Sequence, residues 1–110
     1  MTEFEPPIQN LDTFDIVGQR KDGGVDAVVV CSGPLDDSAE TLSRLNQKVR
    51  NYLREISSEN FRTHFGAGAG VTIFISCGYS VSDAASGMID VLGREAALNG
   101  VGLQIVKDMA

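Results

Sequence analysis

Hydrophobic residues recur along this chain with two different periods, and each change of period marks a boundary between predicted elements. Four short runs alternate or are rich in β-branched residues, which is typical of strands: residues 14–21, 25–31, 71–77 and 101–107. Two longer segments, residues 38–57 and 83–98, carry apolar residues three or four positions apart, as amphipathic helices do. The pattern predicts the order strand–strand–helix–strand–helix–strand.

Turn and cap residues agree with these boundaries. Residues 22–24, Asp-Gly-Gly, separate the first two strands, and glycine reaches positive φ without strain, so an antiparallel hairpin is expected. Asp37 or Ser38 is placed to cap the first helix, and Asp37 has capping-box spacing to Glu40. The charged side chains of this helix are expected to lie mostly off its apolar stripe: Arg44, Lys48, Arg50 and Arg54.

The later part of the chain follows the same logic. Residues 58–70 are predicted to be a polar and then glycine-rich connection, which Phe61 and Phe65 pin to the core. Ser82 or Asp83 is placed to cap the second helix, and Asn-Gly at residues 99–100 is a typical helix stop.

Helices that alternate with strands predict parallel strands joined by right-handed crossovers. The fold class is therefore α/β, a two-layer sandwich with the order ββαβαβ. Its four-stranded mixed sheet has an N-terminal antiparallel hairpin and carries both helices on one face. Residues 13–110 form this single domain, and residues 1–12, with Pro6 and Pro7, are an extended lead-in.

The second face of such a sheet would be left open. The alternation places four apolar residues on it: Val28, Val30, Phe74 and Val106. They are mixed there with the polar residues Asp26, Thr72, Ser76 and Gln104. A half-apolar open face is often closed by a protein partner or a second subunit, and the lead-in is an alternative cover.

Polar residues follow the second and third strands, where parallel sheets bind ligands. These candidate binding residues are Asp36, Asp37, Tyr79, Asp83 and Ser86. Three carboxylates at one edge are suited to Mg²⁺, although Asp and Ser are also the ordinary residues of helix N-caps. The cap interpretation is favoured, so no metal site is assigned.

Other candidate residues lack the context that chemistry needs. His64 stands without a second histidine or a placed nucleophile. Cys31 and Cys77 each end an apolar run, where cysteine packs as a small hydrophobe, although both thiols could meet at adjacent strand ends. The glycine-rich residues 66–70 precede a strand, whereas a phosphate-binding loop follows one. The sequence therefore predicts neither catalytic residues nor a cofactor.

Charge and hydropathy limit the classes of partner that this chain is expected to bind. Fifteen acidic residues against nine basic ones give a net charge of −6, which disfavours nucleic acid and anionic membrane surfaces. The N-terminal residues lack the apolar core of a signal peptide, and no apolar run approaches the length of a membrane span. A cytoplasmic location is expected.

Two resemblances add to this interpretation. The run at residues 33–38 (Gly-Pro-Leu-Asp-Asp-Ser), Asn-Tyr-Leu at 51–53 and Asn-Gly-Val at 99–101 resemble a family of small uncharacterised bacterial α/β domains. Residues 33–36 and 39–42, and Asp-Ala-Ala-Ser-Gly at 83–87, are similar to the first helix and the switch motif of STAS domains, the anti-sigma-factor antagonists. The second resemblance implies a regulator that is phosphorylated on a serine. The family's serine position falls on alanine here, so Ser86 would replace it.

Three hypotheses follow. The favoured one is a non-catalytic protein-interaction or dimerisation module that associates through the open sheet face. The alternatives are a STAS-like regulator switched at Ser86 and a small Mg²⁺-dependent enzyme that uses Asp36, Asp37 and Asp83.

Overall fold

The computed structural model of this chain describes Ile8, Leu11 and residues 14–66 and 70–106. The elements follow one another as β1 (Ile16–Gln19), β2 (Val25–Val30), α1 (Ala39–Ile56), α2 (Glu59–Phe65), β3 (Val71–Ser76), α3 (Asp83–Leu98) and β4 (Val101–Val106). Most of the predicted lead-in, part of the glycine-rich run and Lys107 of the last predicted strand lie outside the described residues.

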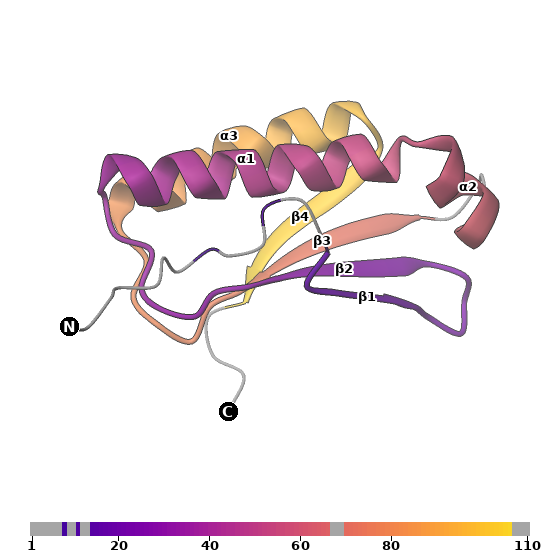
Figure 1. Cartoon of the computed structure of the whole chain (residues 1–110), viewed down its shortest axis with the longest axis horizontal. Coiled ribbons are helices and arrows are strands. Elements are labelled where there is room, and N and C mark those ends of the chain that lie inside the picture. The colour runs from indigo at the N-terminus through magenta and orange to yellow at the C-terminus, as the bar shows by residue number, and fades with distance from the viewer. Residues whose placement is uncertain (1–7, 9–10, 12–13, 67–69, 107–110) are drawn as a thin grey trace.

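The four strands form one mixed sheet in the order β1-β2-β3-β4. β1 is antiparallel to β2, whereas β2, β3 and β4 are parallel. Figure 1 shows α1 and α3 side by side over one face of this sheet, with α2 beyond the C-terminal end of α1. The predicted fold class is confirmed, including the N-terminal hairpin and the helices on one face. The sequence pattern had left the strand order open.

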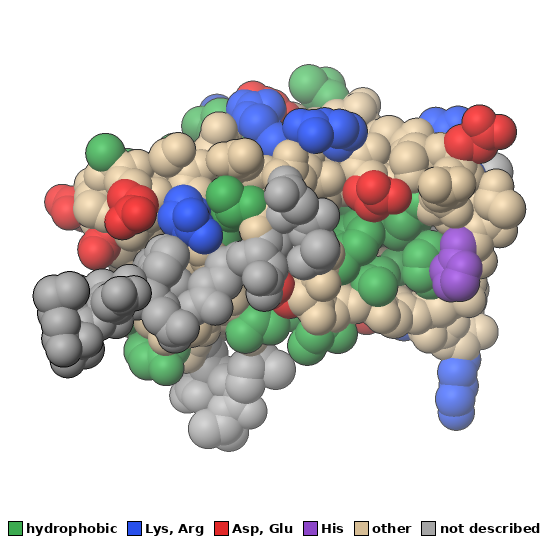
Figure 2. Space-filling view, in the orientation of Figure 1, with side chains coloured by type: hydrophobic (Ala, Val, Ile, Leu, Met, Phe, Trp, Pro, Cys, Tyr) green, Lys and Arg blue, Asp and Glu red, His purple; other side chains and the backbone are tan. Residues whose placement is uncertain are grey.

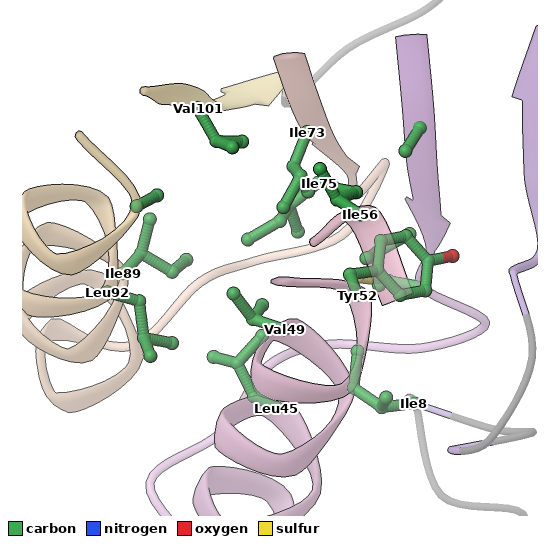
Figure 3. Packing of buried hydrophobic residues seen from close by; sticks show 14 of the residues in the cluster. Ile8, Leu45, Val49, Tyr52, Ile56, Ile73, Ile75, Ile89, Leu92 and Val101 are labelled. Carbon is green, nitrogen blue, oxygen red and sulfur yellow. The ribbon is translucent and has the colours of Figure 1, made fainter. Parts of the chain in front are cut away.

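The core lies between this sheet and the two long helices. Alternate residues of β2 and β3 are buried beneath the helices: Val25, Ala27, Val29, Val71, Ile73 and Ile75. Figure 3 shows the helical residues that meet them, among which Leu45 and Val49 come from α1 and Ile89 and Leu92 from α3. The two central strands, β2 and β3, thus each bury one of their two faces, as their period of two predicts, whereas β1 is exposed along its length.

Serine side chains fix where the long helices begin. The Ser38 hydroxyl accepts a hydrogen bond from the Thr41 N–H before α1, and the Ser82 hydroxyl accepts one from the Ala85 N–H before α3. In each case the serine, rather than the neighbouring aspartate, is the N-cap. Both alternatives that the sequence left open are therefore resolved in the same way.

The connection between α1 and β3 differs from the prediction, because it contains the short helix α2. The Ser58 hydroxyl caps this helix at the Phe61 N–H, and Glu59 lies in its first turn. Phe61 is buried and Phe65 half-buried, with ring centroids 4.6 Å apart, so one turn of helix brings both rings to the core. The predicted anchoring role of these two residues is correct, although the predicted irregular structure is wrong.

A second correction concerns Lys48, which was expected off the apolar stripe of α1. Its side chain is completely buried, and its Nζ lies 2.9 Å from Asp15 Oδ1. Residues of the lead-in bond to the same helix: Ile8 is fully buried, its carbonyl accepts a bond from Arg44 Nε, and the Leu11 carbonyl accepts one from Asn51 Nδ2. The described residues of the lead-in therefore pack along α1.

Candidate functional site

The open face of the sheet brings together the apolar residues that the alternation placed there. The strand register puts Val28 directly opposite Phe74, and Val30 and Val106 on either side of Ser76. The antiparallel register adds Ile16, which lies opposite Val28 on the same face. The five apolar residues Ile16, Val28, Val30, Phe74 and Val106 are called the open-face patch below.

The open-face patch is accessible to solvent to different degrees. Ile16 is 56% and Val30 42% exposed, whereas Val28, Phe74 and Val106 are half-buried by their neighbours. Figure 1 shows the described helices on the opposite side of the sheet, and Figure 2 shows hydrophobic side chains along the lower margin of the molecule. This surface is thus apolar and is not covered by any described helix or strand.

The open face carries little charge. Asp26 is the only charged residue among the strand positions that face away from the helices. The residues in line with it on the other strands are Gly18, Thr72 and Gly102. Its carboxylate forms an ion pair with Arg20, which follows β1. Arg20 also pairs with the exposed Asp22 at 3.3 Å, so its one positive charge is shared between two carboxylates at this end of the sheet.

The predicted cover by the lead-in does not apply to its described residues. Ile8 and Leu11 belong to the hydrophobic core or pack against it, and both carbonyls are bonded by side chains of α1. The helices lie on the other side of the sheet from the open-face patch (Figure 1). Within the described part of the lead-in, the chain therefore packs on the helical layer.

The predicted strand-end edge is a real structural unit. The loops that follow β2 and β3 are joined by a parallel bridge between Leu35 and Val81. The Leu35 N–H donates to the Ser80 carbonyl at 3.0 Å, and the Ser82 N–H donates to the Leu35 carbonyl at 2.8 Å. This bridge holds the starts of α1 and α3 next to each other.

Asp36 lies in this edge but is used locally. One of its carboxylate oxygens accepts bonds from the Ser38 N–H at 3.1 Å and the Ser38 hydroxyl at 2.7 Å. Hydrogen bonds from Thr41 and Ser38 hold the pKa of Asp36 below its usual value. The carboxylate thus supports the N-terminus of α1, which is the cap interpretation favoured from the sequence.

The other predicted residues of this edge, Asp37, Tyr79, Asp83 and Ser86, are exposed. Ser86 lies one turn into α3, where its N–H donates to the Ser82 carbonyl at 2.9 Å. Among the residues that the structure describes, no group of three His, Cys, Asp or Glu side chains converges as a metal site would require. The Mg²⁺ hypothesis gains no support from this geometry.

Two other features, His64 and a small cavity, contribute to neither of these sites. His64 lies on the surface of α2, where its ring contacts Phe65 at a centroid distance of 4.5 Å. A small cavity of about 140 Å³ lies at the opposite end of the sheet from the Leu35–Val81 bridge, lined by Arg62, Gly66, Asn99 and residues around them. Neither His64 nor the lining of this cavity includes a residue of the open-face patch or of the strand-end edge.

Sequence reasoning missed two members of the open face, Ile16 and Arg20. The turn at residues 22–24 contained the signal for both. A hairpin closed there pairs Gly18 with Asp26 and Ile16 with Val28, which places these residues on one face. Applying the register as well as the alternation would have found them.

Comparison with known protein families, with curated proteins and with solved structures finds no match to this chain. The resemblances to small uncharacterised bacterial domains and to STAS domains therefore remain predictions. Within the described ranges, none of the helices is long and apolar enough to cross a membrane.

Proposed function

We propose that this chain is a non-catalytic interaction module that pairs with a second copy of itself through the open-face patch. The observation that carries the proposal is a sheet face with five apolar residues, two of them about half exposed, on the side away from α1 and α3. Removal of such a patch from water is the usual source of stability in subunit association.

Charge favours a second copy as the occupant. Two chains of net charge −6 repel each other at most orientations. Repulsion is smaller at the open face, because Asp26 is its one strand carboxylate and is paired with Arg20 within each chain. A two-fold axis would bring the same apolar residues together from both copies, with the sheets packed face to face at about 10 Å.

Binding is preferred to catalysis because the residues at the strand-end edge are engaged in local structure or exposed separately. Asp36 bonds to Ser38, and Ser82 caps α3. We also propose a cytoplasmic location for the module, where both buried cysteines would be kept as thiols.

The oligomeric state tests this proposal with a matched pair of variants. Val30 on the open face and Val91 on the outer side of α3 are similarly exposed, at 42% and 49%. We expect the unmodified chain to be dimeric by sedimentation equilibrium, Val30→Lys to be monomeric and Val91→Lys to stay dimeric. Both variants should remain folded, since each changes a half-exposed side chain.

Two results would overturn the proposal. One is a strictly monomeric unmodified chain at high micromolar concentration. The other is a Val30→Lys variant that dimerises as tightly as Val91→Lys, because a buried lysine pair on a two-fold interface is strongly unfavourable.

A further inference from the structure

Cys31 and Cys77 are direct neighbours on adjacent strands. Cys31 follows the last residue of β2 and Cys77 follows the last residue of β3, and the Val30–Ser76 register continues through them. The Cys31 N–H donates to the Ser76 carbonyl at 2.9 Å. The alternation directs both side chains toward the helical layer, where Cys31 is 6% and Cys77 0% exposed.

The two thiols also interact with each other and with the loops around them. The Cys77 thiol lies 3.6 Å from the Tyr79 carbonyl and 3.9 Å from the Gly33 carbonyl, and it is close enough to Cys31 to raise the pKa of that thiol. Neighbouring strands lie about 4.8 Å apart, which falls within the Cα separations that disulfides span, about 4.4–6.8 Å. Bond formation thus needs a rotation of the thiols and a small approach of the strand ends.

We propose that Cys31 and Cys77 form a dithiol that closes reversibly to an intrachain disulfide when the chain meets a low-molecular-weight disulfide. The thiolate of one cysteine attacks the small disulfide, so that a mixed disulfide forms and one small thiol leaves. The second cysteine then attacks the protein sulfur of that mixed disulfide, and a second small thiol leaves. Two protein S–H bonds are replaced by one S–S bond, and the small disulfide takes up the two electrons and two protons.

The surroundings of the pair set the rate of this exchange. Burial raises the pKa of the Cys31 thiol, and the charge and hydrogen bond of Cys77 raise it further. Little Cys31 thiolate is therefore present at neutral pH, so attack by Cys31 is slow there and accelerates as the pH rises. Opening of the loops that follow the two strands, which contain Gly33 and Gly78, gives the oxidant access.

Closure of the pair would stabilise one end of the fold. The loops beyond the cysteines are already joined at Leu35 and Val81, and they carry the N-caps Ser38 and Ser82. A covalent link between the strand ends restricts the unfolded chain across the whole segment from Cys31 to Cys77. Since the bond joins residues of a preformed sheet, it should be intrachain at any protein concentration.

Oxidation of the full chain with glutathione disulfide at mildly alkaline pH tests the proposal. We expect a mass loss of about 2 Da without a glutathione adduct, a peptide that joins the two cysteines, and a thermal midpoint raised by at least about 5 °C. Dithiothreitol should reverse all three changes. The Cys31→Ser variant should show no gain in midpoint and only a glutathione adduct on Cys77.

The unmodified chain alone decides the outcome if Cys31→Ser does not fold. Two unreacted thiols per chain after prolonged exposure, a stable glutathione adduct in place of the internal bond, or disulfides only between chains would each overturn the proposal. Denaturing gels without reductant separate the last of these outcomes from the noncovalent dimer of the open-face patch, so either proposal can fail without the other.

Discussion

Lys48 and Asp15 form a buried ion pair that joins α1 to the start of β1, with Lys48 Nζ 2.9 Å from Asp15 Oδ1. The other carboxylate oxygen of Asp15 accepts a bond from the Val30 N–H at 2.9 Å. The Tyr52 hydroxyl accepts from the Asp15 N–H at 2.8 Å and donates to the Val28 carbonyl at 2.7 Å. The edge strand is therefore fastened to both the helix and its neighbouring strand.

Replacement of Lys48 by alanine should lower the free energy of unfolding by about 3 kcal/mol, because it leaves the largely buried Asp15 side chain without its ammonium partner. Urea denaturation monitored by circular dichroism measures the change. Arg50→Ala is the matched control on the same helix: its ion pair with Glu95 is exposed, and we expect a loss below about 1 kcal/mol. Equal losses for the two variants would contradict a structural role for the buried pair.

The Tyr52 hydroxyl should lose its proton at a higher pH than an exposed tyrosine does. Burial raises its pKa to about 12 in the folded chain, against about 10 for an unfolded tyrosine. The folded state therefore holds this proton more tightly, and the stability that it contributes is complete below about pH 10 and is lost as the pH rises toward 12.

A Tyr79→Phe variant leaves Tyr52 as the one tyrosine, so its tyrosinate absorbance can be followed alone. We expect a midpoint near pH 12, coincident with or followed by loss of the folded signal. An absorbance midpoint near pH 10 while the circular dichroism is still native would be inconsistent with the buried hydroxyl.

The two serines near the start of α3 should differ in their effect on stability. Ser82→Ala removes the acceptor of the Ala85 N–H, which should cost about 1 kcal/mol. Ser86→Ala alters an exposed residue one turn later, and its effect should stay within about 0.5 kcal/mol. Thermal denaturation of both variants measures the difference, and a larger loss for Ser86→Ala would show that its side chain has a structural partner.

Two glycines give predictions of opposite sign. Gly100 follows the end of α3 with φ +75°, so Gly100→Ala should destabilise the fold by about 1 kcal/mol. Gly87 lies inside α3, and an added methyl group there would meet nothing within 4 Å, so Gly87→Ala should stabilise the fold by up to about 1 kcal/mol. Chemical denaturation of each variant checks the sign, and a destabilised Gly87→Ala would argue against the helix boundaries.

Local signals in the sequence were sufficient for much of the fold. The period-two runs locate all four strands, and the glycines at residues 23–24 define the hairpin. The short helix α2 could not be predicted, because its seven residues contain too few turns for a periodic pattern of apolar residues. Its N-cap, Ser58, lies among polar residues that are equally typical of a loop.

Lys48 shows the limit of such reasoning in this chain. It lies three residues after Leu45 and four before Tyr52, so it borders the apolar stripe of α1, and its charge alone suggested solvent. Its counterion Asp15 is far away in sequence and is brought near only when the sheet edge docks on the helix. A long-range charge pair of this kind leaves no periodic trace.

The open face was largely predictable, because alternation alone assigns Val28, Val30, Phe74 and Val106 to one side of the sheet. The ion pair on that face was not predictable, since it depends on a turn that brings the Arg20 guanidinium back to Asp26. The sequence also predicted that the residues after β2 and β3 share one edge. It could not show that Asp36 bonds to Ser38 at the start of α1, because that contact depends on the local three-dimensional geometry.

The sheet order β1-β2-β3-β4 has a consequence for synthesis on the ribosome. Each strand pairs with the one that left the ribosomal tunnel before it, so a nascent chain never has to insert a late strand between two early ones. The hairpin and α1 can dock as soon as Asp15 and Lys48 have both emerged, and β3 and β4 then add at one growing edge. In such vectorial assembly the outer edge of β1 stays the same and only the opposite edge changes as strands are added, which limits mispairing during translation.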